Sequence, residues 1–328
     1  MREPLFQKRN KEKWQQYEKD LDKLNQITPD TQADMFVELT DDLAYSRTFY
    51  PQSNTTKYLN NLAVKLHQAI YKNRKERSNR FVEFWTRELP TLFYHSHKQL
   101  LLAFVIFTIA MGIGALSAAN DGTFVRLILG DQYVNMTLDN IAKGDPMAVY
   151  KGEEETPMFL YITINNIRVS FLAFVMGAML SFGTGFILLT NGIMLGAFQY
   201  FFYQKGVFIT SVLAVWIHGT LEISAIVIAG CAGFVMGNSI LFPGTFSRLE
   251  SFKKGAKQGL KIIVGLVPIF IAAGFLESFV TRHYQENWVL NLSIILISLT
   301  FIIFYFVIYP IYLNRNSQSQ LYDEPQKS

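Results

Sequence analysis

Four ionisable residues lie inside long apolar stretches of the sequence: Arg168, His218, Glu222 and Glu277. His218 and Glu222 are four residues apart, so on a helix their side chains share one face. A histidine beside a carboxylate in an apolar setting is suited to relaying a proton, binding an ion or forming a buried ion pair. Because ionisable groups inside a bilayer are costly, each of the four is a candidate functional residue.

Asn165 and Asn166 join these four residues in a predicted intramembrane polar cluster. In a structural interpretation, Arg168 neutralises one glutamate and asparagine side chains tie helix ends together. In a second interpretation, the cluster transports an ion or relays protons. Metal-dependent catalysis is a third, but zincin chemistry needs two histidines and a glutamate on one helix, and the segment 218–222 has one of each. We therefore predict no catalytic, cofactor-binding or metal-binding residue and a protein that is not an enzyme.

Long apolar helices must hold this cluster, and the sequence supplies about six apolar stretches, all but the short third one long enough to cross a bilayer. The predicted spans are Leu100–Ala119, Tyr161–Leu189, Gly192–Tyr203, Val207–Gly237, Ile262–Thr281 and Val289–Leu313. Because 207–237 exceeds the roughly 20 residues of one crossing, we expect residues 207–217 to form a re-entrant half-helix that breaks at Gly219. Small or helix-bending residues that we expect at helix contacts or breaks are Asn191, Gly192, Gly196, Gly219, Gly230, Gly233 and Pro268.

Charge divides the chain near residue 99. Residues 1–99 hold 17 Lys and Arg and 13 Asp and Glu, whereas residues 100–328 hold 13 of each. Three amphipathic stretches in the charged segment predict a soluble helical bundle. Residues 81–97, rich in aromatic side chains and interrupted by Pro90, suit an interfacial elbow helix. The predicted domains are a helical region 1–99, a transmembrane domain 100–313 and a polar tail 314–328, which makes the fold class an all-α polytopic membrane protein.

The distribution of charge also predicts the orientation. The basic segment 1–99 and the basic loop 248–261 belong in the cytoplasm, and the acidic loop 120–156 belongs outside. Six crossings then leave both termini cytoplasmic. A basic excess beside a membrane domain is a topology signal, so we expect the lipid bilayer as a partner and no nucleic acid.

Several motifs together resemble the Stage II sporulation protein M family of bacterial multipass membrane proteins. The soluble segment contributes Trp14, Asp42-Leu43-Ala44-Tyr45, Pro51, Tyr58-Leu59-Asn60, His67 and Ile70-Tyr71. The membrane segment contributes Asn165-Asn166, Asn191-Gly192, Gly196, His218-Gly219-Thr220-Leu221-Glu222, Gly230, Gly233, Pro243, Pro268 and Ala272-Ala273-Gly274-Phe275-Leu276-Glu277. The resemblance covers about residues 5–313.

The resemblance implies a bacterial inner-membrane protein without an established catalytic activity. It suggests a scaffold or assembly factor of the cell envelope that docks cytoplasmic and envelope partners, such as a MoxR-type AAA ATPase or cell-wall enzymes linked to peptidoglycan remodelling. A second copy of the chain is a further candidate partner. The alternative function is a permease-like component of a transporter or ion pathway that uses the intramembrane histidine and glutamates.

Overall fold

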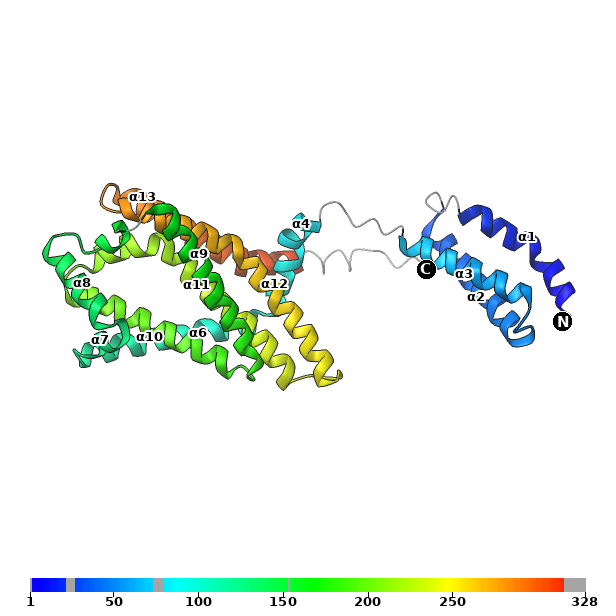
Figure 1. Ribbon diagram of the computed structural model, residues 1–328, viewed down its shortest axis with the longest axis horizontal. Helices are drawn as coiled ribbons and strands as arrows, with labels where there is room; N and C mark the ends of the chain where they lie inside the picture. The colour runs from blue at the N-terminus through cyan, green and yellow to red at the C-terminus, as the bar shows by residue number, and fades with distance from the viewer. Residues whose placement is uncertain (1, 22–26, 73–79, 153, 316–328) are drawn as a thin grey trace. The chain divides into compact units, whose positions relative to one another are not determined.

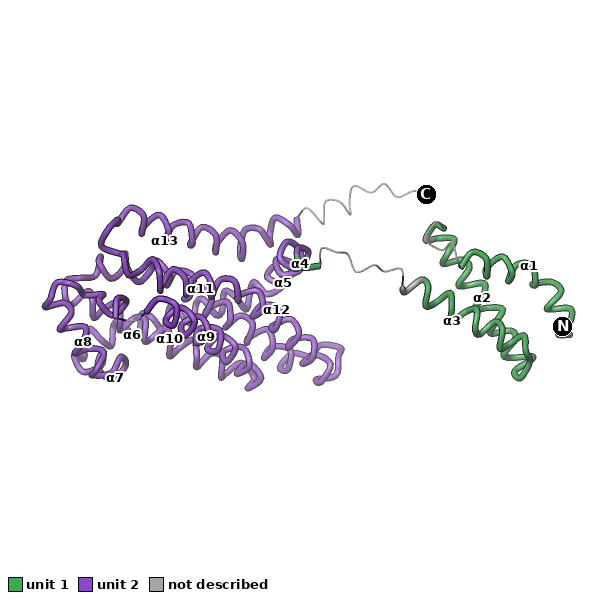
Figure 2. Tube along the Cα trace, turned by 45° about the horizontal axis from the view of Figure 1, so that its top comes forward, with its two compact units in different colours: residues 1–81 green, residues 82–328 purple. Residues whose placement is uncertain are grey.

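The computed structural model describes residues 2–21, 27–72, 80–152 and 154–315, and the described residues form helices and no strands. The chain divides into two compact units, Met1–Phe81 and Val82–Ser328 (Figure 2). The predicted elbow region therefore belongs almost entirely to the second unit. Residues 316–328 of the predicted tail lie outside the described residues.

The first unit is a bundle of three helices, α1 (Glu3–Leu21), α2 (Pro29–Phe49) and α3 (Asn54–Lys72) (Figure 1). Its apolar core contains Phe6, Trp14, Met35, Leu39, Leu43, Leu59, Leu62, Ala63 and Leu66. The indole N–H of Trp14 donates to Asp42 Oδ2 at 2.8 Å, and Lys13 Nζ lies 2.8 Å from the same oxygen. One carboxylate thus satisfies the only polar atom of a buried tryptophan side chain. The predicted helical bundle is confirmed.

A short helix that changes pitch leads into the second unit: α4 (Arg80–Glu83), the π-helical turn η2 (Phe84–Glu88) and α5 (Leu89–His95). The N–H of Leu89 reaches Phe84 O, five residues back, instead of Trp85 O. Pro90 has no N–H to donate to Thr86 O, four residues back. Two successive carbonyls therefore lose their usual helical donors.

Two tyrosines of the last membrane helix satisfy these carbonyls. Tyr305 donates its hydroxyl to Trp85 O at 2.6 Å, and Tyr309 donates to Thr86 O at 2.9 Å. Phe93 also packs edge-on against Phe306, with ring centroids 4.8 Å apart. The elbow helix is thus fastened to the end of the membrane unit, with Leu89, Leu92 and Phe93 buried in protein.

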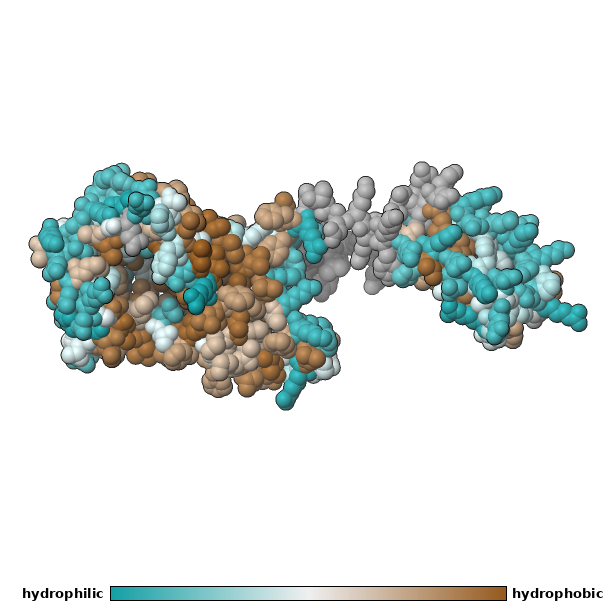
Figure 3. All heavy atoms as spheres, in the orientation of Figure 1, coloured by the Kyte–Doolittle hydropathy of each residue, from teal (hydrophilic) through white to brown (hydrophobic). Residues whose placement is uncertain are grey.

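Six helices among the described residues are long and apolar enough to cross a membrane. They are α6 (His97–Asn120), α9 with η4 (Glu155–Ala178), α10 (Phe182–Gln204), α11 (Phe208–Leu241), α12 with η5 and η6 (Arg248–His283), and α13 with η7 and the residues after it (Trp288–Arg315). Hydrophobic residues cover the middle of the second unit, and hydrophilic ones gather toward its two ends (Figure 3). The all-α polytopic fold is confirmed.

The boundary between the second and third spans differs from the predicted one. The chain turns at residues 179–181, where Leu180 (φ 53°) and Ser181 (φ 72°) have left-handed backbone conformations. We expected the second span to continue to Leu189, and the turn residues Met179, Leu180 and Ser181 include neither glycine nor proline. The actual turn gives α10 a full crossing length of 23 residues.

The prediction of a re-entrant half-helix over 207–217 is wrong. The helix α11 continues without interruption for 34 residues, and Gly219 is buried inside it. One glycine costs a helix only about 1 kcal/mol, whereas freeing backbone groups inside a bilayer costs several kcal/mol for each group. Keeping the helix intact through Gly219 therefore costs less than breaking it. Packing against other helices on most sides of α11 adds to this preference. Pro268 likewise lies within α12 (Arg248–Phe275) and does not end it.

Glycines allow several helices to approach α10 and α11 closely. A Cβ atom on Gly192 or Gly196 would collide with α6 backbone, at Phe107 O and Met111 O respectively. A Cβ on Gly233 would collide with Thr184 of α10, and one on Gly230 with the Leu188 side chain. Gly219 differs, because a Cβ there would meet only Val215 of its own helix, at 3.7 Å. Asn191 bonds within its own helix, donating to Ile187 O at 2.8 Å.

The polar segment between the first two spans folds into a helical cap, which no sequence pattern had led us to expect. It consists of α7 (Phe124–Leu129), α8 (Asp131–Ala142) and the 3-10 turn η3 (Ala148–Lys151). Val125, Val134 and Met147 of the cap pack with Phe201, Phe202, Ala214, Ile217 and Tyr284. A few apolar residues thus anchor an otherwise polar segment onto the ends of the spans.

We expect Gly196→Ala to lower the free energy of unfolding by about 1–3 kcal/mol, because overpacking forces α6 and α10 apart. Gly219→Ala is the matched control and should leave stability unchanged or raise it by up to about 1 kcal/mol, since alanine is the better helix former. Thermal unfolding of both variants in detergent measures the difference. Equal destabilisation by the two substitutions would contradict the packing described above.

Candidate functional site

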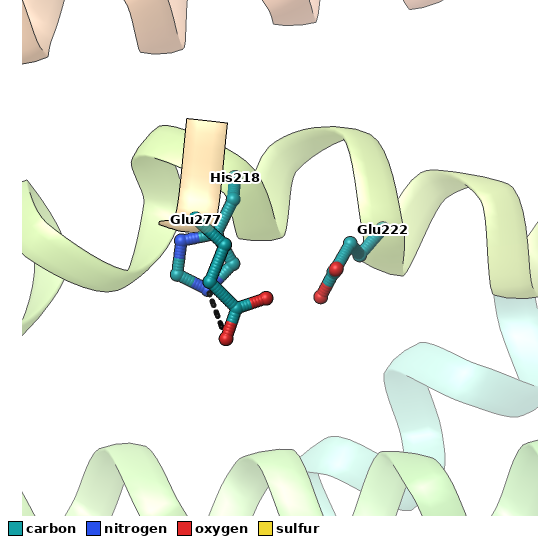
Figure 4. A group of neighbouring side chains, drawn as sticks. All are labelled: His218, Glu222 and Glu277. Carbon is teal, nitrogen blue, oxygen red and sulfur yellow. Dashed lines mark ion pairs between the residues drawn. The ribbon is translucent and has the colours of Figure 1, made fainter. Parts of the chain in front are cut away.

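Two helical segments bring three ionisable side chains together inside the membrane unit. His218 and Glu222 lie one turn apart on α11, and Glu277 comes from the π-helical turn η5 (Leu276–Val280). One ligand atom of each residue lies within 4.8 Å of those of the other two. The three side chains point into the same space beside α11 (Figure 4). We call His218, Glu222 and Glu277 the His–Glu–Glu cluster.

The orientation of the histidine ring follows from a chain of hydrogen bonds. Thr281 Oγ1 donates its single proton to Leu276 O at 3.1 Å, so it accepts from His218 Nδ1–H at 3.0 Å. A neutral imidazole protonated at Nδ1 carries a lone pair on Nε2. His218 is only 3% exposed, and its Nε2 lies 3.9 Å from Glu277 Oε1, beyond hydrogen-bond distance. The lone pair is therefore aimed at the carboxylates.

The π-helical turn η5 is what positions Glu277. The N–H of Thr281 bonds to Leu276 O, five residues back, which inserts one extra residue into the end of α12. The same Leu276 oxygen accepts the Thr281 hydroxyl. Glu277 and the partner of His218 are thus held by one widened turn, and such π-bulges occur frequently at functional sites.

Two further elements contact the cluster. Asn166 of α9 (Glu155–Val175) donates its side-chain amide to Glu222 Oε1. The ring of Tyr150, in the cap, packs edge-on against His218 with centroids 5.4 Å apart. Burial, together with the nearby glutamates, raises the pKa of Tyr150 well above its usual value, so its hydroxyl stays protonated. Residues from α9, α11, the end of α12 and the cap therefore surround the cluster.

The structure leaves two predicted members outside the cluster. Asn165 and Arg168 lie on the exposed side of α9, and Arg168 makes no hydrogen bond or ion pair with any described residue. The expectation that Arg168 neutralises a glutamate is therefore wrong. No lysine or arginine among the described residues forms an ion pair with Glu222 or Glu277, and the ion pair found there joins His218 to Glu277.

The carboxylates are less enclosed than the histidine. The side chain of Glu277 is 14% exposed, and that of Glu222 is also partly exposed. The surface of the second unit is hollowed between α9 and α10 (Figure 3).

Thr281 and Tyr150 were not predicted from the sequence. Thr281 follows Glu277 by four residues, so the two side chains share a helix face and Thr281 could have been predicted beside the cluster. No local sequence pattern distinguishes Tyr150.

The cap is fastened beside the site through Asp145. Its Oδ2 lies 2.6 Å from Lys151 Nζ, and its Oδ1 accepts from the Tyr284 hydroxyl at 2.6 Å and from Gln285 Nε2 at 3.3 Å. Partial burial raises the pKa of Asp145, but the bonds from Lys151 and Tyr284 outweigh it and lower the pKa overall. Burial and the Asp145 carboxylate raise the pKa of Tyr284 to about 12, so it remains a donor.

Comparison with models of protein families shows which family this chain belongs to. A family model described as Stage II sporulation protein M matches residues 103–282, more than half of the chain. The chain belongs to the Stage II sporulation protein M family. The match includes all of the cluster and the cap, so the Stage II sporulation protein M region holds the complete candidate site. Residues 4–72 match a separate model, described as a domain of unknown function (DUF8413). No curated protein and no solved structure matches the chain.

The lowered pKa of Asp145 predicts that the cap loosens in acid. A carboxyl group whose pKa is lower in the folded than in the unfolded state contributes stability above the unfolded-state pKa, and this is lost as the pH falls through the folded-state pKa. Asp145→Asn should cost about 1 kcal/mol at pH 7 and reduce the loss of stability between pH 7 and about pH 3. Limited proteolysis within residues 121–154 at both pH values measures this, with exposed Asp139→Asn as the control.

Proposed function

We propose that the membrane unit is a permease-like component that binds a cation at the His–Glu–Glu cluster. The observation that carries the proposal is that carboxylate oxygens of Glu222 and Glu277 lie within 4.8 Å of each other with no lysine or arginine among their described partners. A buried carboxylate that lacks a basic partner is costly and is accommodated by a proton or by a bound cation. Arg168, the one basic residue that the predicted second span offers, lies on the exposed side.

The position of the cluster supports access from the side of the cap. Tyr150 of η3 contacts His218, and Arg282 beside Thr281 forms an ion pair with Glu155 at 3.1 Å. The cap and the ends of α9 and η6 therefore lie beside the site. By the positive-inside rule, we place this side outside a bacterial inner membrane and both termini in the cytoplasm.

Cation movement down a gradient needs no energy source, whereas movement against one would draw on a partner, because the sequence has no nucleotide-binding motif. We propose that the three-helix bundle of the first unit docks a cytoplasmic protein, of which a MoxR-type AAA ATPase is a candidate. The bundle has its own apolar core and matches its own family model, which supports an independent docking role.

Replacing Glu222 should abolish cation movement without unfolding the protein. We expect Glu222→Gln to reduce Zn²⁺ or Mn²⁺ flux into proteoliposomes at least about tenfold, since one lost ligand costs more than about 1.4 kcal/mol of binding. Glu250→Gln is the matched control, because Glu250 is exposed and pairs only with Lys253 at 2.8 Å among the described residues. Wild-type flux no greater than that of empty vesicles, or unchanged flux in Glu222→Gln, would refute transport.

A membrane scaffold is the second candidate, favoured by the outward-facing polar residues of α9. Arg168 and Asn165 share this exposed face with Tyr161, Ile164 and Leu172. An unpaired arginine facing lipid is costly, and a partner helix bearing a carboxylate would remove that cost. We propose that such an envelope protein docks here, in keeping with a role in cell-envelope assembly.

Site-specific photocrosslinking in native membranes tests the scaffold. A photoreactive residue at position 165 should capture a discrete partner, and Arg168→Glu should reduce the yield severalfold because like charges then face each other. Position 297 on α13 is the control, since Ile297 is 69% exposed on an apolar surface. Equal labelling at 165 and 297 would argue against a specific partner on α9.

A further inference from the structure

We propose that His218, Glu222 and Glu277 bind one divalent transition-metal ion. The inference rests on the proposed cation-binding role of the cluster and names the class of ion. It concerns binding alone, so it can be tested without any measurement of transport.

The state of the histidine favours a metal ligand. Because Thr281 uses its proton on Leu276 O, it accepts from His218 Nδ1–H and leaves the Nε2 lone pair free. This lone pair faces Glu277 Oε1 at 3.9 Å, so two acceptors oppose each other with no donor between them. Two facing acceptors in a nearly buried setting need a proton or a cation between them, and a metal ion accepts electron pairs from both.

The distances within the cluster suit a metal ion. Ligand atoms on opposite sides of a zinc-sized ion are separated by at most about 4.2 Å, from bond lengths of about 2.1 Å. The 3.9 Å between His218 Nε2 and Glu277 Oε1 accommodates two such bonds without movement of the chain. The full set lies within 4.8 Å, so one ion reaches all three ligands when a carboxylate moves closer by about 0.6 Å.

The charge of the cluster matches a divalent ion. With both glutamates deprotonated and the imidazole neutral, the cluster carries a charge of −2, which a divalent ion cancels. No lysine or arginine among the described residues pairs with either glutamate, so the site has no built-in compensation. The neighbours Asn166, Thr281 and Tyr150 are all uncharged at neutral pH.

Hydrogen bonds already orient the ligands. Thr281 fixes the tautomer of His218, and the Asn166 amide holds one oxygen of Glu222. Such supporting bonds are characteristic of metal sites, where they fix the direction of the ligand atoms. A nitrogen donor beside two carboxylates favours Zn²⁺, Mn²⁺, Fe²⁺ or Co²⁺ over Mg²⁺ and Ca²⁺, which prefer oxygen ligands alone.

The test uses the full-length chain purified in detergent and stripped with a chelator. Co²⁺ is titrated while its visible absorption is recorded, and Zn²⁺ is then added to displace it. We expect about one equivalent of Co²⁺ per chain and displacement by Zn²⁺. Glu277→Gln and His218→Gln should weaken binding more than about 100-fold, and Thr281→Val about 10–100-fold by releasing the ring.

The exposed pair His283 and Glu286, with Nδ1 and Oε1 2.7 Å apart, provides the matched control. The double variant His283→Gln/Glu286→Gln should bind Co²⁺ as tightly as the wild type. The unfolding temperature should rise with Zn²⁺ in the wild type and not in Glu277→Gln, which also reports whether each variant folds.

Absence of stoichiometric Co²⁺ or Zn²⁺ binding by the wild type would overturn the inference, as would binding of Ca²⁺ or Mg²⁺ alone. Loss of binding in the His283/Glu286 control instead of the cluster variants would also overturn it. Stoichiometric binding without flux in proteoliposomes would leave the metal site standing and refute the transport function. Flux of another cation, such as H⁺, through a protein that binds no transition metal would leave the transport function standing and refute the metal site.

Discussion

The membrane unit depends on the packing of small residues along α11. Gly230 and Gly233 allow Leu188 and Thr184 of α10 to approach this helix more closely than any larger residue would permit. Because α11 is enclosed on most sides, it remains a single continuous helix through Gly219. That rigidity fixes His218 and Glu222 relative to the turn that carries Glu277. Close packing thus does more here than stabilise the fold, because it holds ionisable groups in a defined arrangement inside an apolar bundle.

At two irregular turns of the membrane unit, side-chain hydroxyls donate to backbone carbonyls. In η2 and at Pro90, the carbonyls of Trp85 and Thr86 accept tyrosine hydroxyls from the last helix. In η5, Thr281 supplies both its N–H and its hydroxyl to Leu276 O. The first device fastens the elbow helix to the end of the bundle, and the second builds the candidate site. Both follow from the same constraint, since a polar backbone group left unpaired within a bilayer is costly.

Membership of the Stage II sporulation protein M family agrees with the location of the site. The matched region begins within α6 and ends just after Thr281, so it contains the cluster, its supporting residues and the cap. The three-helix bundle matches a separate domain model. The chain therefore combines a family-defining membrane unit with a distinct helical unit, and the chemistry proposed above belongs to the first of these.

The sequence alone determined the class of fold and the candidate residues. Apolar length required about six spans, and the scarcity of charge within them singled out His218, Glu222 and Glu277. It also paired His218 with Glu222, because spacing of four residues is a local property of a helix. It misplaced the turn at Leu180 and Ser181, which depends on tertiary packing and carries no glycine or proline signal.

Only the tertiary structure decided which distant residues meet. Glu277 reaches the pair on α11 from a segment far along the chain, and Thr281 and Tyr150 complete the surroundings. Arg168, the expected counter-charge, lies on the other side of its helix. Periodicity along one helix gives the relative directions of its own side chains. It contains no information on which face of α9 turns toward α11, and that choice leaves both carboxylates without a lysine or arginine partner among the described residues.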